Sequence, residues 1–180
     1  MPSSVEIQRL IDLADADAVL PGIDAIFFQS SNTQSFADAA AKEQFRERWL
    51  GRYLMHDRRW AYVALAADGT AAGYLIASLD DPALTPRFAD IAYFADFKHL
   101  TARFPAHLHI NLAPHARGQG TGSALIARFA SDAEDAGAPG VHVVTSRGAR
   151  NAGFYAQNGF TERGATGQGP REIVFLGREL

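Results

Sequence analysis

Apolar side chains recur at helical spacing in the first third of the chain. After Ser35 the apolar positions are three to five residues apart, with charged residues between them: Phe36, Ala40, Phe45, Trp49 and Tyr53. This pattern predicts a helix that Ser35 opens. A shorter helical segment precedes it, from about Asp15 to Phe27, and we expect Pro21-Gly22 to break or kink that segment.

The hydrophobic period then changes to the short runs typical of strands. Residues 60–65 and 73–77 flank Asp68-Gly69, a dipeptide that favours a β-hairpin turn. Further strands are predicted over residues 106–112, 140–145 and 171–178, and helices over 120–136 and 150–158, with Gly159 as a C-terminal cap. Residues 80–104 are irregular and aromatic, which predicts a long excursion with a short helix, of the kind that often serves as a lid or binding loop.

This order of elements predicts an α/β fold with a mixed, mostly antiparallel sheet flanked by helices. The length of 180 residues predicts a single domain over residues 1–180. The charge balance of 17 Lys plus Arg against 20 Asp plus Glu argues against nucleic acid as a partner. The first residues resemble no secretory signal, and no apolar run approaches the roughly 20 residues that span a bilayer, so we expect a soluble, cytoplasmic protein with no membrane partner.

The absence of cysteine removes several kinds of chemistry at once. With no cysteine in the chain there are no disulfides, thiolate metal sites or cysteine nucleophile. His107, His109 and His142 would approach one another if their strands were adjacent, but no spacing brings three ligands to one side, and we expect no metal.

A glycine-rich segment joins the strand at 106–112 to the helix that follows. Its sequence is Arg117-Gly118-Gln119-Gly120-Thr121-Gly122. Glycines allow the backbone to approach a ligand closely, and a helix N-terminus carries partial positive charge, so the segment suits a phosphate or pyrophosphate. It lacks the lysine of a P-loop and the glycine spacing of the dinucleotide fingerprint. The alternative is a loop that simply begins a packed helix.

Two motifs together resemble the GCN5-related N-acetyltransferase (GNAT) family. Arg117–Gly122 matches that family's (Gln/Arg)-x-x-Gly-x-(Gly/Ala) motif, and residues 150–160 are similar to its Asn-x-x-(small)-x-x-Phe-Tyr-x-x-x-Gly-Phe segment, one residue shorter before Phe154-Tyr155. The resemblance covers roughly residues 60–176 and implies the GNAT acyl-CoA N-acyltransferase fold. The stretch 104–112 is similar to bacterial acetyltransferases related to the acetyltransferase-like domain of protein O-GlcNAc hydrolases, where an acidic residue is expected at the position of Asn111.

The resemblance implies that acetyl-CoA is the co-substrate. The pyrophosphate would bind the glycine-rich loop, and the pantetheine arm would pair with the preceding strand. Asn151 and Tyr155 are four residues apart and share one helix face, where Asn151 would bind the pantetheine arm and Tyr155 would protonate the departing CoA thiolate. The alternative for Tyr155 is a packed aromatic with its hydroxyl at the surface. The residues implied in cofactor binding are Ile110, Asn111, Leu112, Ala113, Arg117, Gly118, Gln119, Gly120, Thr121, Gly122, Ser123, Asn151, Phe154 and Tyr155.

Polar and apolar side chains alternate on the strand before the loop. His107, His109 and Asn111 share one face, and the apolar residues Leu108, Ile110 and Leu112 share the other. Three polar groups on one face indicate a wet pocket, so His107 or His109 is a candidate base and Asn111 a candidate acceptor-binding residue. The alternative is that each histidine is structural. Tyr93, Phe94 and Phe97 of the excursion would either wall an acceptor pocket or anchor the segment to the core.

We therefore expect an N-acetyltransferase that acts on an amine of a small molecule or protein, as a monomer or homodimer. Without cysteine an acyl-enzyme on sulfur is excluded, which favours direct attack in a ternary complex. The alternative is a non-catalytic acetyl-CoA/CoA-binding module. A third possibility is a nucleotide-binding protein of another kind that uses the same loop.

Overall fold

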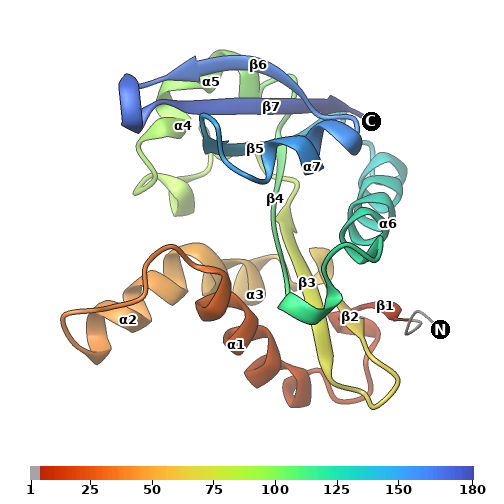
Figure 1. Ribbon diagram of the computed structural model, residues 1–180. Helices are drawn as coiled ribbons and strands as arrows, with labels where there is room; N and C mark the ends of the chain where they lie inside the picture. Colours follow the sequence, from red (N-terminus) through yellow and green to blue (C-terminus); the bar gives the residue numbers. More distant parts are fainter. Residues whose placement is uncertain (1–4) are drawn as a thin grey trace. The chain divides into compact units, whose positions relative to one another are not determined.

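The computed structural model describes residues 5–180 and contains a seven-stranded mixed sheet (Figure 1). The strands are β1 (Glu6–Arg9), β2 (Ala61–Leu65), β3 (Ala71–Ser78), β4 (Ala106–Leu112), β5 (Gly140–Ser146), β6 (Thr161–Thr166) and β7 (Ile173–Glu179). Their order in the sheet is β1-β2-β3-β4-β5-β7-β6. The pair β4–β5 is parallel, whereas β1–β2, β2–β3, β5–β7 and β6–β7 are antiparallel, which confirms the predicted mixed, mostly antiparallel α/β fold.

Seven α-helices accompany these strands in the described part of the chain. They are α1 (Leu20–Ser30), α2 (Ala39–Arg46), α3 (Arg52–His56), α4 (Tyr93–Asp96), α5 (Lys98–Thr101), α6 (Thr121–Asp135) and α7 (Ala152–Gln157).

The described chain divides into two compact units. The first unit holds residues 5–77 and 109–129, and the second holds residues 78–108 and 130–180. Whether the chain is one functional domain stays a prediction.

The helical part of the first unit differs from its prediction in two ways. Pro21 does not break a helix: it lies in the first turn of α1, where the missing N–H has no helical partner to lose. The predicted continuous helix from Ser35 is instead three pieces, because α2 and α3 are joined by a π-helical segment over Glu47–Gly51. Such segments are rare and are often found at functional sites.

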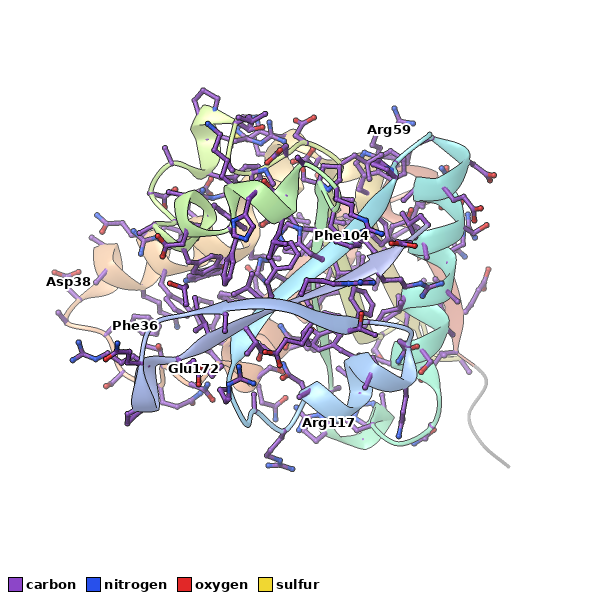
Figure 2. All side chains as sticks on the ribbon, turned by 90° about the horizontal axis from the view of Figure 1, so that it is seen from above. Phe36, Asp38, Arg59, Phe104, Arg117 and Glu172 are labelled. Carbon is purple, nitrogen blue, oxygen red and sulfur yellow. The ribbon has the colours of Figure 1, made fainter. Side chains whose placement is uncertain are left out.

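Asp38, not Ser35, caps the second helix. Its Oδ1 accepts a hydrogen bond of 2.8 Å from the backbone N–H of Ala41 (Figure 2 labels Asp38). The cap satisfies one of the donors that the first turn leaves without a helical partner.

Replacing Asp38 with alanine is expected to lower the free energy of unfolding by about 1 kcal/mol, the usual value of a lost N-cap. Urea unfolding followed by circular dichroism measures the change. Asp38→Asn is the control, because asparagine is an equally good cap and retains the bond. An equal loss in both variants would contradict the capping role.

The second unit is built on the neighbouring strands β5, β7 and β6, which lie side by side in Figure 1. Its core includes Phe97, Phe104 and Phe175, each at most 1% exposed. Figure 2 labels Phe104, whose ring lies close to the backbone of Gly140 in β5: a Cβ there would be 2.6 Å from the Phe104 ring. The strand β6 was not predicted, because its sequence is polar on both faces and none of its residues is buried.

No helix in the described chain is long and apolar enough to cross a membrane. Residues 5–180 contain no group of three or more His, Asp or Glu side chains arranged to hold a metal ion.

Candidate functional site

The glycine-rich loop has the backbone conformation that only glycine adopts easily. Gly118 and Gly120 have φ values of +72° and +83°, and a Cβ at either position would meet no atom within 4 Å. The glycines are therefore required by conformation and not by crowding inside the protein. The space over both residues is open to a ligand.

The loop leads directly into α6, whose first turn supplies backbone donors. Among the described residues, no backbone acceptor is recorded for the N–H groups of residues 118–123. The first four N–H groups of a helix lack helical partners, and they carry the positive end of the helix dipole. Successive donors on an exposed loop are suited to an anion.

Arg117 is exposed at the start of this loop, and a hydrogen bond from its Nε fixes the side chain. Its Nε donates to the carbonyl oxygen of Leu112 at 3.2 Å, while no partner is recorded for its Nη groups within residues 5–180. Gln119 is held similarly, because its side chain donates to the carbonyl of His115 at 2.6 Å. The loop conformation is thus tied to the end of β4, and the charged end of Arg117 remains available.

The last residues of β4 present alternate backbone groups to the two sides of the strand. On one side, the N–H of Ala113 donates to the carbonyl of Ala72 at 2.9 Å. Since successive residues alternate, the backbone groups of Ile110 and Leu112 point to the opposite side from those of Asn111 and Ala113. Gly73 in β3 permits this close approach, because a Cβ there would clash with the Leu112 side chain.

Tyr155 is a buried residue of α7, with 6% of its surface exposed. Its ring packs against Phe154 and Phe160, with centroids 5.3 and 5.6 Å away. Burial raises the pKa of Tyr155 to about 12, so the hydroxyl keeps its proton at neutral pH. No hydrogen-bond partner of that hydroxyl is recorded among the described residues, so it is available as a donor.

Asn151 precedes α7 and is fixed by the neighbouring strand. Its Oδ1 accepts a hydrogen bond of 2.9 Å from the Thr145 hydroxyl of β5. Gly159 has a φ of +84° and ends the helix, as predicted. The predicted proton donor and the predicted pantetheine ligand thus both belong to the second unit.

His109 lies in the first unit, against a tyrosine and a tryptophan. Its Nε2 is 3.2 Å from the hydroxyl of Tyr53, and the Trp49 and Tyr53 rings meet the imidazole edge-on at 5.7 and 5.3 Å. Desolvation, with a smaller contribution from the positive charge of Arg52, lowers the pKa of His109 to about 4. The imidazole is therefore neutral across the physiological range.

Asn111 is anchored in the same way on the same face of β4. Its Nδ2 donates to the hydroxyl oxygen of Tyr74 at 2.8 Å. Burial raises the pKa of Tyr74 well above its usual value, so this hydroxyl is also protonated at neutral pH. Both anchoring tyrosines are at most 1% exposed.

His107 has different surroundings from His109, although strand alternation makes the two equivalent in sequence. It is 2% exposed in the second unit, and its ring stacks on His142 with centroids 5.5 Å apart. Phe88 and Phe94 close over it edge-on at 4.8 and 5.6 Å. These contacts favour the structural interpretation of His107, and its role as a base stays a prediction.

The aromatic residues predicted to line an acceptor pocket lie in and beside α4. Phe94 and Phe97 are at most 4% exposed, and Phe97 packs on Phe175 with centroids 5.2 Å apart. Tyr93 is half-buried and packs against the same core. These contacts favour an anchoring role for Phe94 and Phe97, and a substrate contact remains a prediction for all three.

Comparison with known proteins decides the family. A model described as an acetyltransferase (GNAT) domain matches residues 59–162, more than half of the chain. The chain belongs to the GNAT family.

Solved structures agree with this GNAT assignment at the level of the fold. The protein named SsHAT is 21% identical, with 98% of each chain covered and a TM-score of 0.73. The ribosomal-protein-alanine N-acetyltransferase of Brucella melitensis is 22% identical, with 97% of this chain and 99% of that one covered and a TM-score of 0.62. An acetyltransferase of Bacillus anthracis, solved in complex with acetyl coenzyme A, is 17% identical over 67% of this chain and 61% of its own, with a TM-score of 0.51.

Three residues that contact the polar face of β4 were not predicted as candidates: Trp49, Tyr53 and Tyr74. Trp49 and Tyr53 were assigned only to the apolar face of a helix, and Tyr74 to a hairpin strand. Tyrosine at an apolar position was the available signal, because a buried hydroxyl generally requires a hydrogen-bond partner. The hydrogen-bond partner of Tyr53 could not be predicted from the sequence, because His109 is 56 residues away along the chain.

Proposed function

We propose that this protein is an acetyl-CoA-dependent N-acetyltransferase that acts on an amine of a small molecule or protein. The observation that carries the proposal is the open loop at Gly118–Gly120, with its unpartnered backbone donors, in a chain that belongs to the GNAT family. No other segment of the described chain combines positive-φ glycines, an arginine and the start of a long helix.

The proposed ligand of the loop is the pyrophosphate of acetyl-CoA. The N–H groups of residues 118–123 are the donors, and the helix dipole of α6 favours negative charge at this end. The free Nη groups of Arg117 add a full positive charge that is suited to a phosphate oxygen. The backbone of Ile110 and Leu112, which faces away from β3, is the proposed partner of the pantetheine amides.

The proposed reaction is direct transfer. The neutral amine attacks the thioester carbon, a C–N bond forms, the C–S bond breaks, and the nitrogen loses a proton. A backbone N–H of the Ile110–Ala113 stretch is the proposed donor to the developing oxyanion. Tyr155 is the proposed donor to the leaving thiolate, supported by a pKa of about 12, which keeps its hydroxyl protonated.

The pKa of Tyr155 also defines its part in the step. A thiol has a pKa of about 8.5, so full transfer of the tyrosine proton to the thiolate is uphill in the free enzyme. We therefore propose that Tyr155 passes its proton to the sulfur only as the proton that leaves the acceptor nitrogen replaces it, so that no free tyrosinate is formed. The sum of the two transfers leaves Tyr155 protonated and the thiol neutral.

Ligand-induced stabilisation tests the proposal. CoA at 100 times its Kd is expected to stabilise the protein by about 2.7 kcal/mol, or roughly 5–10 °C in melting temperature, with no shift from ATP or NAD⁺. Acetyl-CoA with a panel of amines is expected to release free thiol, measured with a chromogenic disulfide. Stabilisation by ATP or NAD⁺ instead of CoA would reject the acetyl-CoA site. Stabilisation by CoA without thiol release from any amine would favour the non-catalytic module.

A further inference from the structure

Two buried tyrosines hold the polar face of β4 in a defined orientation. Tyr53 fixes the Nε2 edge of His109, and Tyr74 occupies an amide donor of Asn111. In each case the opposite atom of the polar residue, His109 Nδ1 or Asn111 Oδ1, has no recorded hydrogen-bond partner among residues 5–180. Both His109 and Asn111 are half-buried, whereas both tyrosines are buried.

The two atoms without partners belong to the same strand face. Residues two apart in a strand point the same way and are about 6.6 Å apart along it. Within the described residues of the first unit, the hydrogen bonds that orient His109 and Asn111 are made, but neither of these two atoms takes part in one. In each residue one polar atom is held by a tyrosine hydroxyl and the other polar atom has no partner. Such an arrangement is typical of a preorganised binding site.

We propose that His109 Nδ1 and Asn111 Oδ1 are the hydrogen-bond acceptors that bind the N–H groups of the acceptor amine in its neutral form, with Tyr53 and Tyr74 as positioning residues. This inference rests on the proposed function. It adds to it the residues that bind the acceptor, the protonation state of the bound amine and the class of amine that is preferred.

The role requires one tautomer of His109. A neutral amine must keep its lone pair for attack on the thioester, so the protein has to bind it through its N–H hydrogens. Nδ1 must then be the unprotonated nitrogen, and Nε2–H must donate to the oxygen of Tyr53. The opposite tautomer would donate to the lone pair and oppose the reaction.

The surroundings of His109 also exclude its titration in the neutral range. The groups that face it are Trp49 of the π-helical segment, and Tyr53 and Arg52 of α3. The charged group among them is Arg52, which disfavours an imidazolium, and desolvation has the same effect. His109 therefore binds the amine but does not store its proton, and the enzyme depends on amine that is already neutral.

This dependence predicts the class of acceptor. At pH 7.5 about a third of an α-amino group is neutral, against roughly 0.1% of a lysine side chain. The site therefore favours α-amines, as in amino acids and peptide N-termini, over alkylamines. The expected preference in kcat/KM is at least about 10-fold, since the greater nucleophilicity of the alkylamine offsets part of the difference in neutral fraction.

The tautomer is measured in the free protein, without any acceptor. Two-bond proton–nitrogen spectra of the ¹⁵N-labelled chain, with His109 assigned by the loss of its signals in His109→Asn, are expected to show the Nε2–H form. Those signals should not titrate between pH 8 and pH 5. The Nδ1–H form, or a titration near pH 6.5, would overturn the proposal whether or not the protein transfers acetyl groups.

A substitution series tests the same atom in the reaction. The amide of asparagine lies near the position of Nδ1 and that of glutamine near Nε2, while phenylalanine keeps the ring without either nitrogen. His109→Phe is expected to lower kcat/KM for the amine roughly 10–100-fold with KM for acetyl-CoA within twofold. His109→Asn should retain more activity than His109→Gln. The reverse order would assign the binding to Nε2 and contradict the proposal.

Two peptide probes, one without lysine and one with a single lysine, test the class of amine. One is the peptide amide Ala-Gly-Ala with a free N-terminus, and the other is N-acetyl-Gly-Lys-Ala amide. For each, log kcat/KM should rise with pH up to the pKa of its own amine, with no limb near pH 6.5. A limb near 6.5 that His109→Asn removes would show that His109 acts as a titrating base. Lack of thiol release with any amine, despite CoA binding, would reject the proposed function and leave the tautomer measurement to decide the inference.

Discussion

Tyr155→Phe is expected to lower kcat about 100-fold while the Kd for CoA changes by less than twofold. The substitution removes the hydroxyl and leaves the ring in its packing between Phe154 and Phe160. General-acid assistance contributes at least about 100-fold in typical enzymes, and here the departing thiolate would lose its donor. Single-turnover measurement of thiol release isolates the chemical step from product release.

The pH profile of the wild-type enzyme provides a second measure of Tyr155. Because its folded pKa of about 12 lies above the usual value of 10, the hydroxyl is protonated throughout the accessible range. The kcat profile should therefore show no alkaline limb from this group below pH 10. Tyr62→Phe is the matched control, since Tyr62 is a fully buried tyrosine of β2 with no assigned role in the reaction. An equal loss of kcat in both variants would identify a general effect of removing buried hydroxyls.

The parts of the fold that sequence predicted best are those that carry strong hydrophobic patterns. The strand at 106–112 and the hairpin around Gly69 were predicted nearly to the residue. The first alternates polar and apolar residues, and the second has two apolar runs that flank a turn glycine of positive φ. β1 and β6 were missed because edge strands bury little and need no apolar face. The π-helical segment was also missed, since its residues continue the apolar pattern of a helix.

The candidate site also has parts that local sequence predicts and parts that depend on tertiary contacts. The loop at 117–122 was predictable because each glycine has a local conformational reason. The distinction between His107 and His109 was not predictable, because both occupy the same face of one strand. It depends on what covers each ring: Phe88 and Phe94 for one, Tyr53 and Trp49 for the other. Those partners are distant in sequence, so only the tertiary structure separates a core histidine from one that is oriented by a hydroxyl.

Gly120→Asp is expected to weaken acetyl-CoA binding at least about 10-fold more than Gly120→Asn. Both side chains tolerate positive φ better than other non-glycine residues, and they are nearly identical in shape. The strain at φ +83° is therefore shared, and the variants differ by one negative charge next to the N-terminus of α6. That charge repels a pyrophosphate and competes for the same backbone donors, which corresponds to at least about 1.4 kcal/mol in binding free energy.

Position 69 supplies the control for this pair. Gly69 has a φ of +82°, and a Cβ there also meets no atom within 4 Å, but it lies in the β2–β3 turn. Gly69→Asp and Gly69→Asn should cost similar stability and leave CoA affinity, measured by isothermal titration calorimetry, within twofold of wild type. The deficit of Gly120→Asp should shrink as salt is raised from 50 to 500 mM, because screening weakens repulsion between exposed charges. Equal affinities of Gly120→Asp and Gly120→Asn would show that no phosphate group binds at this loop, and the position of the pyrophosphate would then have to be sought elsewhere in the chain.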